Sequence, residues 1–205
     1  MPLKALALNA TLKSKSSDEE SSTARLLSLI ETALAEFDVE TETLLLTDYN
    51  IKFGVSSDEG DGDEWPGIRE KILAADIIIL GTPIWLGQPS SVSKMALERM
   101  DAFLEETDEE GRMVSYGKVA AVAVVGNEDG AHHVSAEIFQ AMNDVGFTIP
   151  ANALAYWVGE AMGSTNFVDL KKVPEEVTTM VDMLARNTAH LAGLLKAKQY
   201  PGEDK

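Results

Sequence analysis

The sequence predicts an α/β fold in which helices cover both faces of a parallel β-sheet. Apolar runs and helical patterns alternate five times along the 205 residues, and this alternation is typical of strand–helix–strand units joined by right-handed crossovers. Residues 77–80 are four consecutive large aliphatics, which suits a central strand buried on both faces. Residues 119–125 consist of valine and alanine and indicate a second such strand. A three-layer α/β/α sandwich buries strands of this kind.

The amino-terminal half supplies the elements on one side of the central strand. Strands are expected at residues 3–8 and 39–46, and the second has the mixed apolar and acidic pattern of a sheet edge. A helix is expected between them, over about residues 21–37. Trp65-Pro66 predicts the start of a short helix that ends near residue 75, because proline fits the first turn of a helix.

The carboxyl-terminal half continues the alternation. Helices are expected at residues 90–104 and 134–145, and a fifth strand at residues 153–158. The closing helix begins at residues 174–176, and its apolar residues recur at helical spacing: Val177, Val181, Leu184, Leu191 and Leu195.

Length places these elements in one domain. A chain of 205 residues buries roughly 70% of its unfolded surface, and we expect a single domain over residues 1–199 with a frayed tail over residues 200–205. No apolar run reaches the ~20 residues that cross a bilayer, and the first residues lack the features of a signal peptide. We therefore expect a soluble, cytoplasmic protein.

Charge and cysteine content exclude several functions. The net charge of −17 argues against non-specific binding of nucleic acid or of an anionic membrane. A solvated acidic surface accounts for this charge, and a basic redox partner protein is the alternative. The absence of cysteine excludes disulfides, iron–sulfur ligation and thiolate nucleophiles. The acidic run at residues 57–64 lacks the spacing of a calcium loop, so we expect a solvated, mobile loop and no metal site.

Three loops follow the carboxyl ends of the inner strands, where ligands bind in open parallel sheets. The first loop, residues 9–23, is rich in hydroxyls and leads into a helix start, which is typical of a phosphate cradle. Capping of that helix by Ser22 or Thr23 explains the same residues. The acidic triplet at residues 18–20 repels phosphate unless it turns outward.

The second loop, residues 82–91, and the third loop, residues 126–133, complete the group. The second has two prolines, two glycines and Trp85, whose ring offers a flat wall for a planar ligand or a cover for the sheet edge. In the third, Gly126 and Gly130 allow close approach of a ligand to the main chain, and a turn capped by Asp129 is the alternative. Together the three loops indicate one ligand site.

The second loop resembles that of flavodoxin-like NAD(P)H-dependent FMN reductases, including the iron–sulfur flavoproteins and the related NAD(P)H:quinone reductases. The family reads small-Pro-Ile-aromatic-x-Gly-x-x-Ser, then Lys and Asp-Arg, and the resemblance covers residues 3–164. This chain reads Thr82-Pro83-Ile84-Trp85-Leu86-Gly87-Gln88-Pro89-Ser90-Ser91, then Lys94 and Glu98-Arg99. The resemblance implies a flavodoxin-like sandwich with a five-stranded parallel sheet in the order 2-1-3-4-5.

The resemblance also implies a non-covalent FMN site and the residues that form it. The first loop would hold the phosphate through Thr11, Lys13, Ser22 and Thr23. The second would line the isoalloxazine through Thr82, Pro83, Ile84, Trp85, Leu86 and Gly87. The third would meet the pyrimidine edge through Asn127, Glu128, Asp129 and Gly130, with His132 near the flavin carbonyls or a substrate or simply at the start of a surface helix.

Two features depart from the family pattern. The usual Asn-Gly-Ser-x-Arg opening is Asn9-Ala10-Thr11-Leu12-Lys13 here. The cysteines of the iron–sulfur branch are absent at residues 53–56, so electrons cannot leave through a cluster.

By this resemblance the protein passes hydride from NAD(P)H through FMN to a quinone, free flavin or similar small acceptor, with no catalytic side chain. A homodimer or homotetramer is expected. The alternative is a flavodoxin-type electron carrier without NAD(P)H oxidation. A receiver domain is disfavoured because Asn9 and Thr82 stand where it needs acids, and no G-x-G-x-x-G or G-K-[ST] motif supports a nucleotide-binding alternative.

Two further positions have alternative interpretations. Arg99 is expected in a surface ion pair with Glu98 or Asp101, and a contact with a cofactor phosphate or a neighbouring subunit is the alternative. Tyr156 and Trp157 either complete the ligand site or a dimer contact, or pack in the core.

Overall fold

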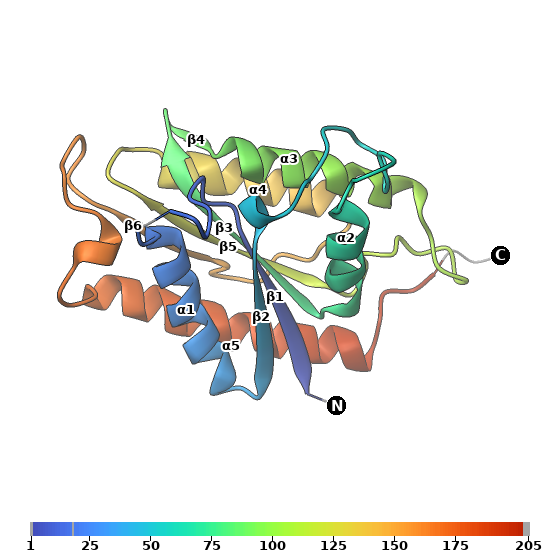
Figure 1. Ribbon diagram of the computed structural model, residues 1–205. Helices are drawn as coiled ribbons and strands as arrows, with labels where there is room; N and C mark the ends of the chain where they lie inside the picture. Colours follow the sequence, from blue (N-terminus) through green and yellow to red (C-terminus); the bar gives the residue numbers. More distant parts are fainter. Residues whose placement is uncertain (1, 18, 203–205) are drawn as a thin grey trace.

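The computed structural model describes residues 2–17 and 19–202 and confirms the three-layer sandwich (Figure 1). Within that range, five parallel strands form the sheet: β1 (Leu3–Asn9), β2 (Val39–Leu45), β3 (Ile77–Trp85), β5 (Val119–Gly126) and β6 (Leu154–Val158). Their order is β2-β1-β3-β5-β6, and the short β4 (Gln88–Pro89) pairs antiparallel with β3. This is the 2-1-3-4-5 order of flavodoxin-like folds, as expected.

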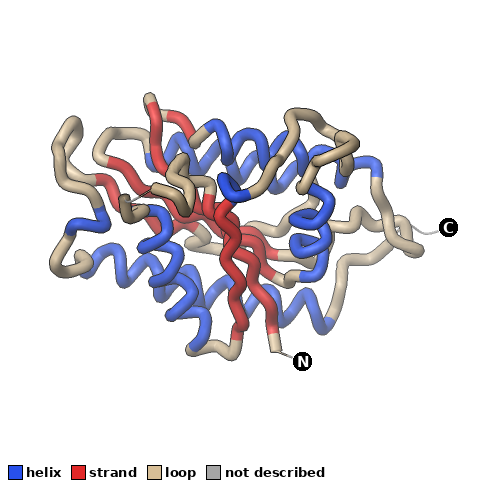
Figure 2. Tube along the Cα trace, in the orientation of Figure 1, coloured by secondary structure: helices blue, strands red, loops and turns tan. Residues whose placement is uncertain are grey.

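Helices cover both faces of the sheet (Figures 1 and 2). One face packs against α1 (Ser22–Ala35) and α5 (Glu175–Ala197), and the other against α2 (Trp65–Ala74), α3 (Ser91–Met100) and α4 (Ala131–Asp144). Short 3₁₀ helices occur at η1 (Leu46–Asp48), η2 (Asp101–Glu105) and η3 (Phe167–Asp169). Side chains alternate between the two cores because successive strand residues face opposite sides: Leu6 lies in the α2–α4 core and Ala7 in the α1–α5 core.

The central strand is longer than the apolar run that predicts it. Residues 77–80 are fully buried, as expected, but β3 continues to Trp85 because Thr82 and Pro83 stay paired with β5. The chain then reverses through Leu86 and Gly87, whose φ angles of 53° and 73° form the two-residue turn of a β-hairpin. The second loop is therefore mostly a hairpin, β3–β4, and not an irregular segment.

The expected surface ion pair of Arg99 is wrong. Arg99 has no exposed surface, and its guanidinium donates to both carboxylate oxygens of Asp63, at 2.7 Å and 3.1 Å. It also donates to the main-chain oxygens of Lys52 and Ser56, at 2.9 Å and 3.0 Å. The guanidinium carbon of Arg99, Cζ, lies 5.6 Å from the ring centre of Trp65. The planar, five-donor group is suited to such a buried position.

The acidic run at residues 57–64 is largely exposed to solvent, as expected, but hydrogen bonds to a buried carboxylate also hold it. The buried Asp63 carboxylate also accepts from the N–H groups of Lys52, Glu59 and Trp65, at 3.0–3.2 Å. Burial alone would raise the pKa of Asp63, but the hydrogen bonds from Arg99 and from these amides outweigh it and hold the pKa well below its ordinary value. Asp63 and Arg99 thus organise the loop between η1 and α2.

The first residue of the predicted carboxyl-terminal tail contacts the rest of the protein. The ring of Tyr200 packs edge-on against Tyr116 with centroids 5.6 Å apart, and its hydroxyl lies 2.8 Å from Thr148 Oγ1. Residues 203–205 of the predicted tail, and Asp18 of the acidic triplet, lie outside the described residues. No helix in the described part of the chain is long and apolar enough to span a bilayer.

Candidate functional site

A cavity of about 280 Å³ lies where the carboxyl ends of β1, β3, β5 and β6 meet. Segments from four separate parts of the sequence form its walls. Three are the predicted loops, and nine predicted site residues line the cavity: Thr11, Lys13, Ser22, Thr23, Pro83, Ile84, Trp85, Asn127 and Glu128. The other six predicted residues do not: Thr82, Leu86, Gly87, Asp129, Gly130 and His132.

The first loop and the amino terminus of α1 form a hydroxyl-lined wall. The cap of α1 is Ser21, whose Oγ accepts from the N–H of Ala24 at 3.2 Å, so capping does not account for Ser22 or Thr23. Among the described residues, the N–H groups of Ser22 and Thr23 have no acceptor, as is usual in the first turn of a helix. Those donors, with the Thr11 hydroxyl beside them, can hold an anion.

Lys13 is the cation of this wall. Its Nζ lies 3.0 Å from Glu19 Oε2 and donates to the main-chain oxygen of Glu20 at 2.9 Å. Its own carbonyl accepts from Thr47 Oγ1 at 3.0 Å, which ties the first loop to η1. A cation and the first turn of α1 with its free amides therefore line the same cavity.

A second lysine fastens the same loop without lining the cavity. Lys15 Nζ lies 2.8 Å from Asp48 Oδ2. This hydrogen bond raises the pKa of Lys15 and lowers that of Asp48. Both effects favour the charged forms, so the contact persists at neutral pH.

The hairpin forms the second wall through Pro83, Ile84 and Trp85, and Trp85 is 54% exposed. Thr82 is fully buried, and its Oγ1 accepts from the N–H of Ser90 at 3.0 Å. Ser90 Oγ in turn donates to the main-chain oxygen of Ala10 at 2.6 Å. The Thr–Ser pair of this motif therefore joins the first and second loops and does not line the cavity.

The hairpin tip rests on the third loop. The N–H of Leu86 donates to Glu128 Oε1 at 3.1 Å, although the Leu86 side chain is exposed. A Cβ built on Gly130, whose φ is 128°, would lie 3.1 Å from Gly87 Cα. We predicted that Gly130 lets a ligand approach; instead it lets the hairpin approach. At Gly126 a Cβ would lie 2.9 Å from the Ile84 side chain, for the same reason.

In the third loop, Asn127 and Glu128 line the cavity and the next residues turn away. Asp129 Oδ1 accepts from the N–H of Gly130 at 2.8 Å, which is the capped turn proposed as the alternative. The His132 ring packs edge-on against Tyr156 with centroids 5.2 Å apart. His132 is therefore a helix-start residue in contact with β6.

A fourth loop, residues 159–170, closes the cavity, and sequence reasoning did not identify its residues Asn166 and Phe167. Trp157, at the end of β6, also lines the cavity and lies 5.5 Å from the Phe167 ring, between centroids. Trp157 therefore lines the site, and it also packs against the α1–α5 core.

Arg25 holds the fourth loop in place. Its guanidinium donates to the main-chain oxygens of residues 167, 168 and 170, at 2.6–2.9 Å. The Asn166…Asp169 capping box of η3 is a local sequence signal for this wall. The third and fourth loops are joined as well, because Asn127 Nδ2 donates to the main-chain oxygen of Gly163 at 2.9 Å.

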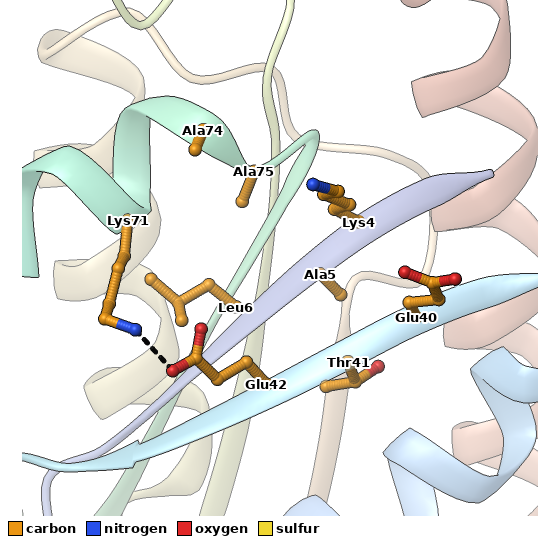
Figure 3. A pocket seen from close by; sticks show the side chains of 9 residues that line it. All are labelled: Lys4, Ala5, Leu6, Glu40, Thr41, Glu42, Lys71, Ala74 and Ala75. Carbon is orange, nitrogen blue, oxygen red and sulfur yellow. Dashed lines mark hydrogen bonds and ion pairs between the residues drawn. The ribbon is translucent and has the colours of Figure 1, made fainter. Parts of the chain in front are cut away.

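Two other hollows lie away from the strand ends. One, of about 320 Å³, lies between β1, β2 and α2, where Lys71 and Glu42 face each other at 2.6 Å (Figure 3). Lys71 and Glu42 pair with each other there, and the lining contains no amino terminus of a described helix. The other, beside Tyr116 and Tyr200, lies beyond the amino end of β5. The cavity at the strand ends has the donors and the aromatic walls of a nucleotide site.

The donor set fits a flavin mononucleotide. Hydroxyls, free amides and Lys13 at one end suit a phosphate, and the Trp85 and Trp157 side chains suit an aromatic ring system. Loops from separate parts of the chain form the site, so its fit to FMN depends on the fold that brings these loops together.

Comparison with known proteins places the chain in a family. The family model described as NADPH-dependent FMN reductase matches residues 3–163. The 8-demethyl-8-aminoriboflavin-5'-phosphate synthase of Streptomyces davaonensis is 33% identical over 213 residues, which cover 98% of this chain and 81% of that protein. The crystal structure of RosB with the bound intermediate 8-demethyl-8-formylriboflavin-5'-phosphate has a TM-score of 0.88 at 32% identity, and the match covers 97% of this chain and 82% of that one.

A third match concerns one segment of a larger protein. The divalent metal cation transporter MntH of Mycobacterium bovis is 35% identical over 206 residues, which cover 95% of this chain but 29% of the transporter. The family model and the full-length relative agree with each other and with the site geometry. The chain belongs to the NADPH-dependent FMN reductase family and is a flavin-dependent oxidoreductase of that family.

Proposed function

We propose that the protein binds FMN non-covalently in this cavity and passes hydride from NAD(P)H to a quinone, free flavin or similar small acceptor. The observation that carries the proposal is the cavity itself, which is lined by hydroxyl groups, by Lys13 and by two tryptophans from four segments of the chain. Bound FMN supplies the redox chemistry.

The phosphate end is formed by the first loop. The N–H groups of Ser22 and Thr23 point along the axis of α1, so its dipole and the free donors both favour a dianion. Lys13 adds a full positive charge, and the Thr11 hydroxyl adds a further donor. These residues hold and orient the nucleotide but transfer no proton.

The ring end is formed by the second and third loops. Pro83, Ile84 and Trp85 supply an apolar wall. In the described structure the N–H of Glu128, which lines the cavity, has no acceptor, and it would stabilise negative charge at the pyrimidine edge. The N–H of Gly130 already donates to the Asp129 carboxylate.

The open side of the cavity suits two substrates that bind in turn. Trp85 and Leu12 are about half exposed there, at 54% and 48%, and both line the cavity. A nicotinamide and then an acceptor would stack on the same exposed face, which gives ping-pong kinetics. No side chain at this mouth needs to act as an acid or base.

The test is oxidation of NADH or NADPH by the purified holoprotein, followed at 340 nm with menadione or free FMN as the acceptor. A reductase turns over repeatedly, whereas a flavodoxin-type carrier consumes little reductant. The control is a matched pair of variants. Lys13→Ala removes the cavity cation, and Lys15→Ala removes the neighbouring lysine that pairs with Asp48. We expect the first to lose FMN and activity, by about tenfold or more in affinity, and the second to keep both. Equal behaviour of the two variants would contradict the assignment.

A second candidate function follows from the relatives. One acts as an 8-demethyl-8-aminoriboflavin-5'-phosphate synthase, and a similar structure holds an 8-formyl flavin phosphate. In this chain the same cavity would then hold the flavin phosphate as a substrate changed at ring position 8. Mass spectrometry of the flavin after aerobic incubation with the protein distinguishes the two. Unchanged FMN alongside NAD(P)H turnover supports the reductase, and a change in flavin mass supports the second candidate.

A further inference from the structure

We propose that the carboxylate of Glu19 is an internal substitute for the flavin phosphate, and that it sets the preference of the site between phosphorylated and unphosphorylated flavin. The proposal rests on the proposed FMN site and adds a residue that determines its specificity.

The ion pair between Glu19 and Lys13 lies at the wall of the cavity. Glu19 and Lys13 both line the cavity, on the wall that carries the hydroxyls and the amino terminus of α1. Lys13 Nζ lies 3.0 Å from Glu19 Oε2. Lys13 therefore already has an anionic partner at the wall that we assign to the phosphate.

The described residues offer a phosphate in this cavity no cation besides Lys13. Of the lysine and arginine side chains in the described residues, Lys13 alone lines the cavity. Arg25 is engaged by three main-chain oxygens of the fourth loop, and Lys15 by Asp48. A bound phosphate dianion must take Lys13 from Glu19 or share it.

A local turn holds Glu19 next to Lys13. The N–H of Glu19 donates to Ser17 Oγ at 3.2 Å, and the N–H of Ser17 donates to the main-chain oxygen of Ser14 at 3.0 Å. Lys13 also donates to the main-chain oxygen of Glu20. The turn thus places Glu19 against Lys13.

These contacts predict a selective effect on affinity. Phosphate binding displaces Glu19 from Lys13 and brings a dianion close to its carboxylate, and both changes oppose binding. Riboflavin has no phosphate and requires neither change. Glu19 therefore weakens the binding of FMN but not of riboflavin, and it limits how long FMN is retained. Such a site can exchange flavin, which suits free FMN as an acceptor.

The experiment compares two neighbouring glutamates. Apoprotein of the wild type, Glu19→Gln and Glu20→Gln is titrated with FMN and with riboflavin, and the dissociation constants are read from flavin fluorescence. Both variants remove one charge from the same turn, but only Glu19 pairs with Lys13 through its carboxylate. We expect Glu19→Gln to tighten FMN binding by about three- to tenfold, the range for an exposed ion pair plus a like-charge contact, with riboflavin unchanged. The gain should shrink at high salt because the charges are solvent-accessible.

Each other outcome overturns the proposal. If Glu19→Gln and Glu20→Gln shift FMN affinity equally, the effect is general charge and not the ion pair. If Glu19→Gln weakens FMN binding, Glu19 supports the site instead of competing with the phosphate. If riboflavin tightens as much as FMN, the turn has changed shape. Saturable FMN binding with no effect of Glu19→Gln sinks this inference alone, whereas no flavin binding in any form sinks the proposed function with it.

Discussion

Replacement of Arg99 by methionine tests whether the buried ion pair organises the segment that leads into α2. Arg99→Met keeps a long apolar side chain but removes the guanidinium. Asp63 is then left as an unpaired carboxylate with no exposed side-chain surface, and the main-chain oxygens of Lys52 and Ser56 lose their donor. The substitution should therefore destabilise the fold well beyond the effect of a surface change.

The expected cost is about 3–5 kcal/mol, the usual range when one partner of a buried pair is removed. For a domain of this size about 1 kcal/mol lowers the Tm by about 2–4 °C, so the Tm should fall by about 6–20 °C. Arg99→Met/Asp63→Asn should cost less than the sum of its two single substitutions, because the asparagine oxygen still accepts from the loop amides and no charge is buried. Arg186→Met, at an exposed position on α5, is the matched control and should change stability by less than about 0.5 kcal/mol.

Guanidinium unfolding and calorimetry of these variants give the values. A loss below about 1 kcal/mol for Arg99→Met, or full additivity in the double variant, would refute the reasoning. The pH dependence supplies a second check. Because the pKa of Asp63 is lower in the folded state, its contribution is complete above about pH 4, its unfolded value, and declines as the pH falls further. The stability difference between the wild type and Asp63→Asn should therefore narrow below that pH.

Three further substitutions test how the loops hold the cavity together. Gly130→Val forces a branched side chain against Gly87 at a φ of 128°, so it should cost about 1–3 kcal/mol and weaken FMN binding in a fluorescence titration; unchanged affinity would separate the hairpin from the site. Glu128→Ala removes the acceptor of the Leu86 N–H, and FMN affinity should fall severalfold while chemical unfolding shifts by less than about 1.5 kcal/mol. Arg25→Ala releases η3 from α1, and hydrogen exchange there should accelerate; an unaltered exchange rate would mean that other contacts hold the fourth loop.

The fold could be predicted from the sequence because its strongest signals are local. The run at residues 77–80 is buried on both faces in any parallel sheet, and alternation with amphipathic helices leaves few topologies. The site could be located because strand ends in such sheets converge at one edge. Thr11, Ser22 and Trp85 line the cavity for that reason.

The residues that the structure places differently from the prediction, or that the sequence did not identify, also have physical explanations. Arg99 was assigned to Glu98 or Asp101, one or two residues away, but its partner Asp63 is 36 residues earlier and no periodicity connects the two. Gly130 and Thr82 were predicted as ligand residues; they do not line the cavity, and each joins loops that only the folded chain brings together. Phe167 was missed because no apolar period or motif marks it, and the two glycines of its loop, Gly159 and Gly163, lie several residues before it.

Several expectations stay predictions. These are the homodimer or homotetramer, the basic redox partner, the cytoplasmic location, the single domain over residues 1–199 and the choice between NADH and NADPH. Each requires measurements on the protein in solution.

The most direct test of the central claim is a titration of the apoprotein with FMN, followed by tryptophan and flavin fluorescence and by the flavin absorption bands. The account predicts saturable binding of one FMN per chain, with quenching of tryptophan emission because Trp85 and Trp157 both line the cavity. Absence of saturable binding, or binding that leaves both tryptophans unaffected, would contradict it.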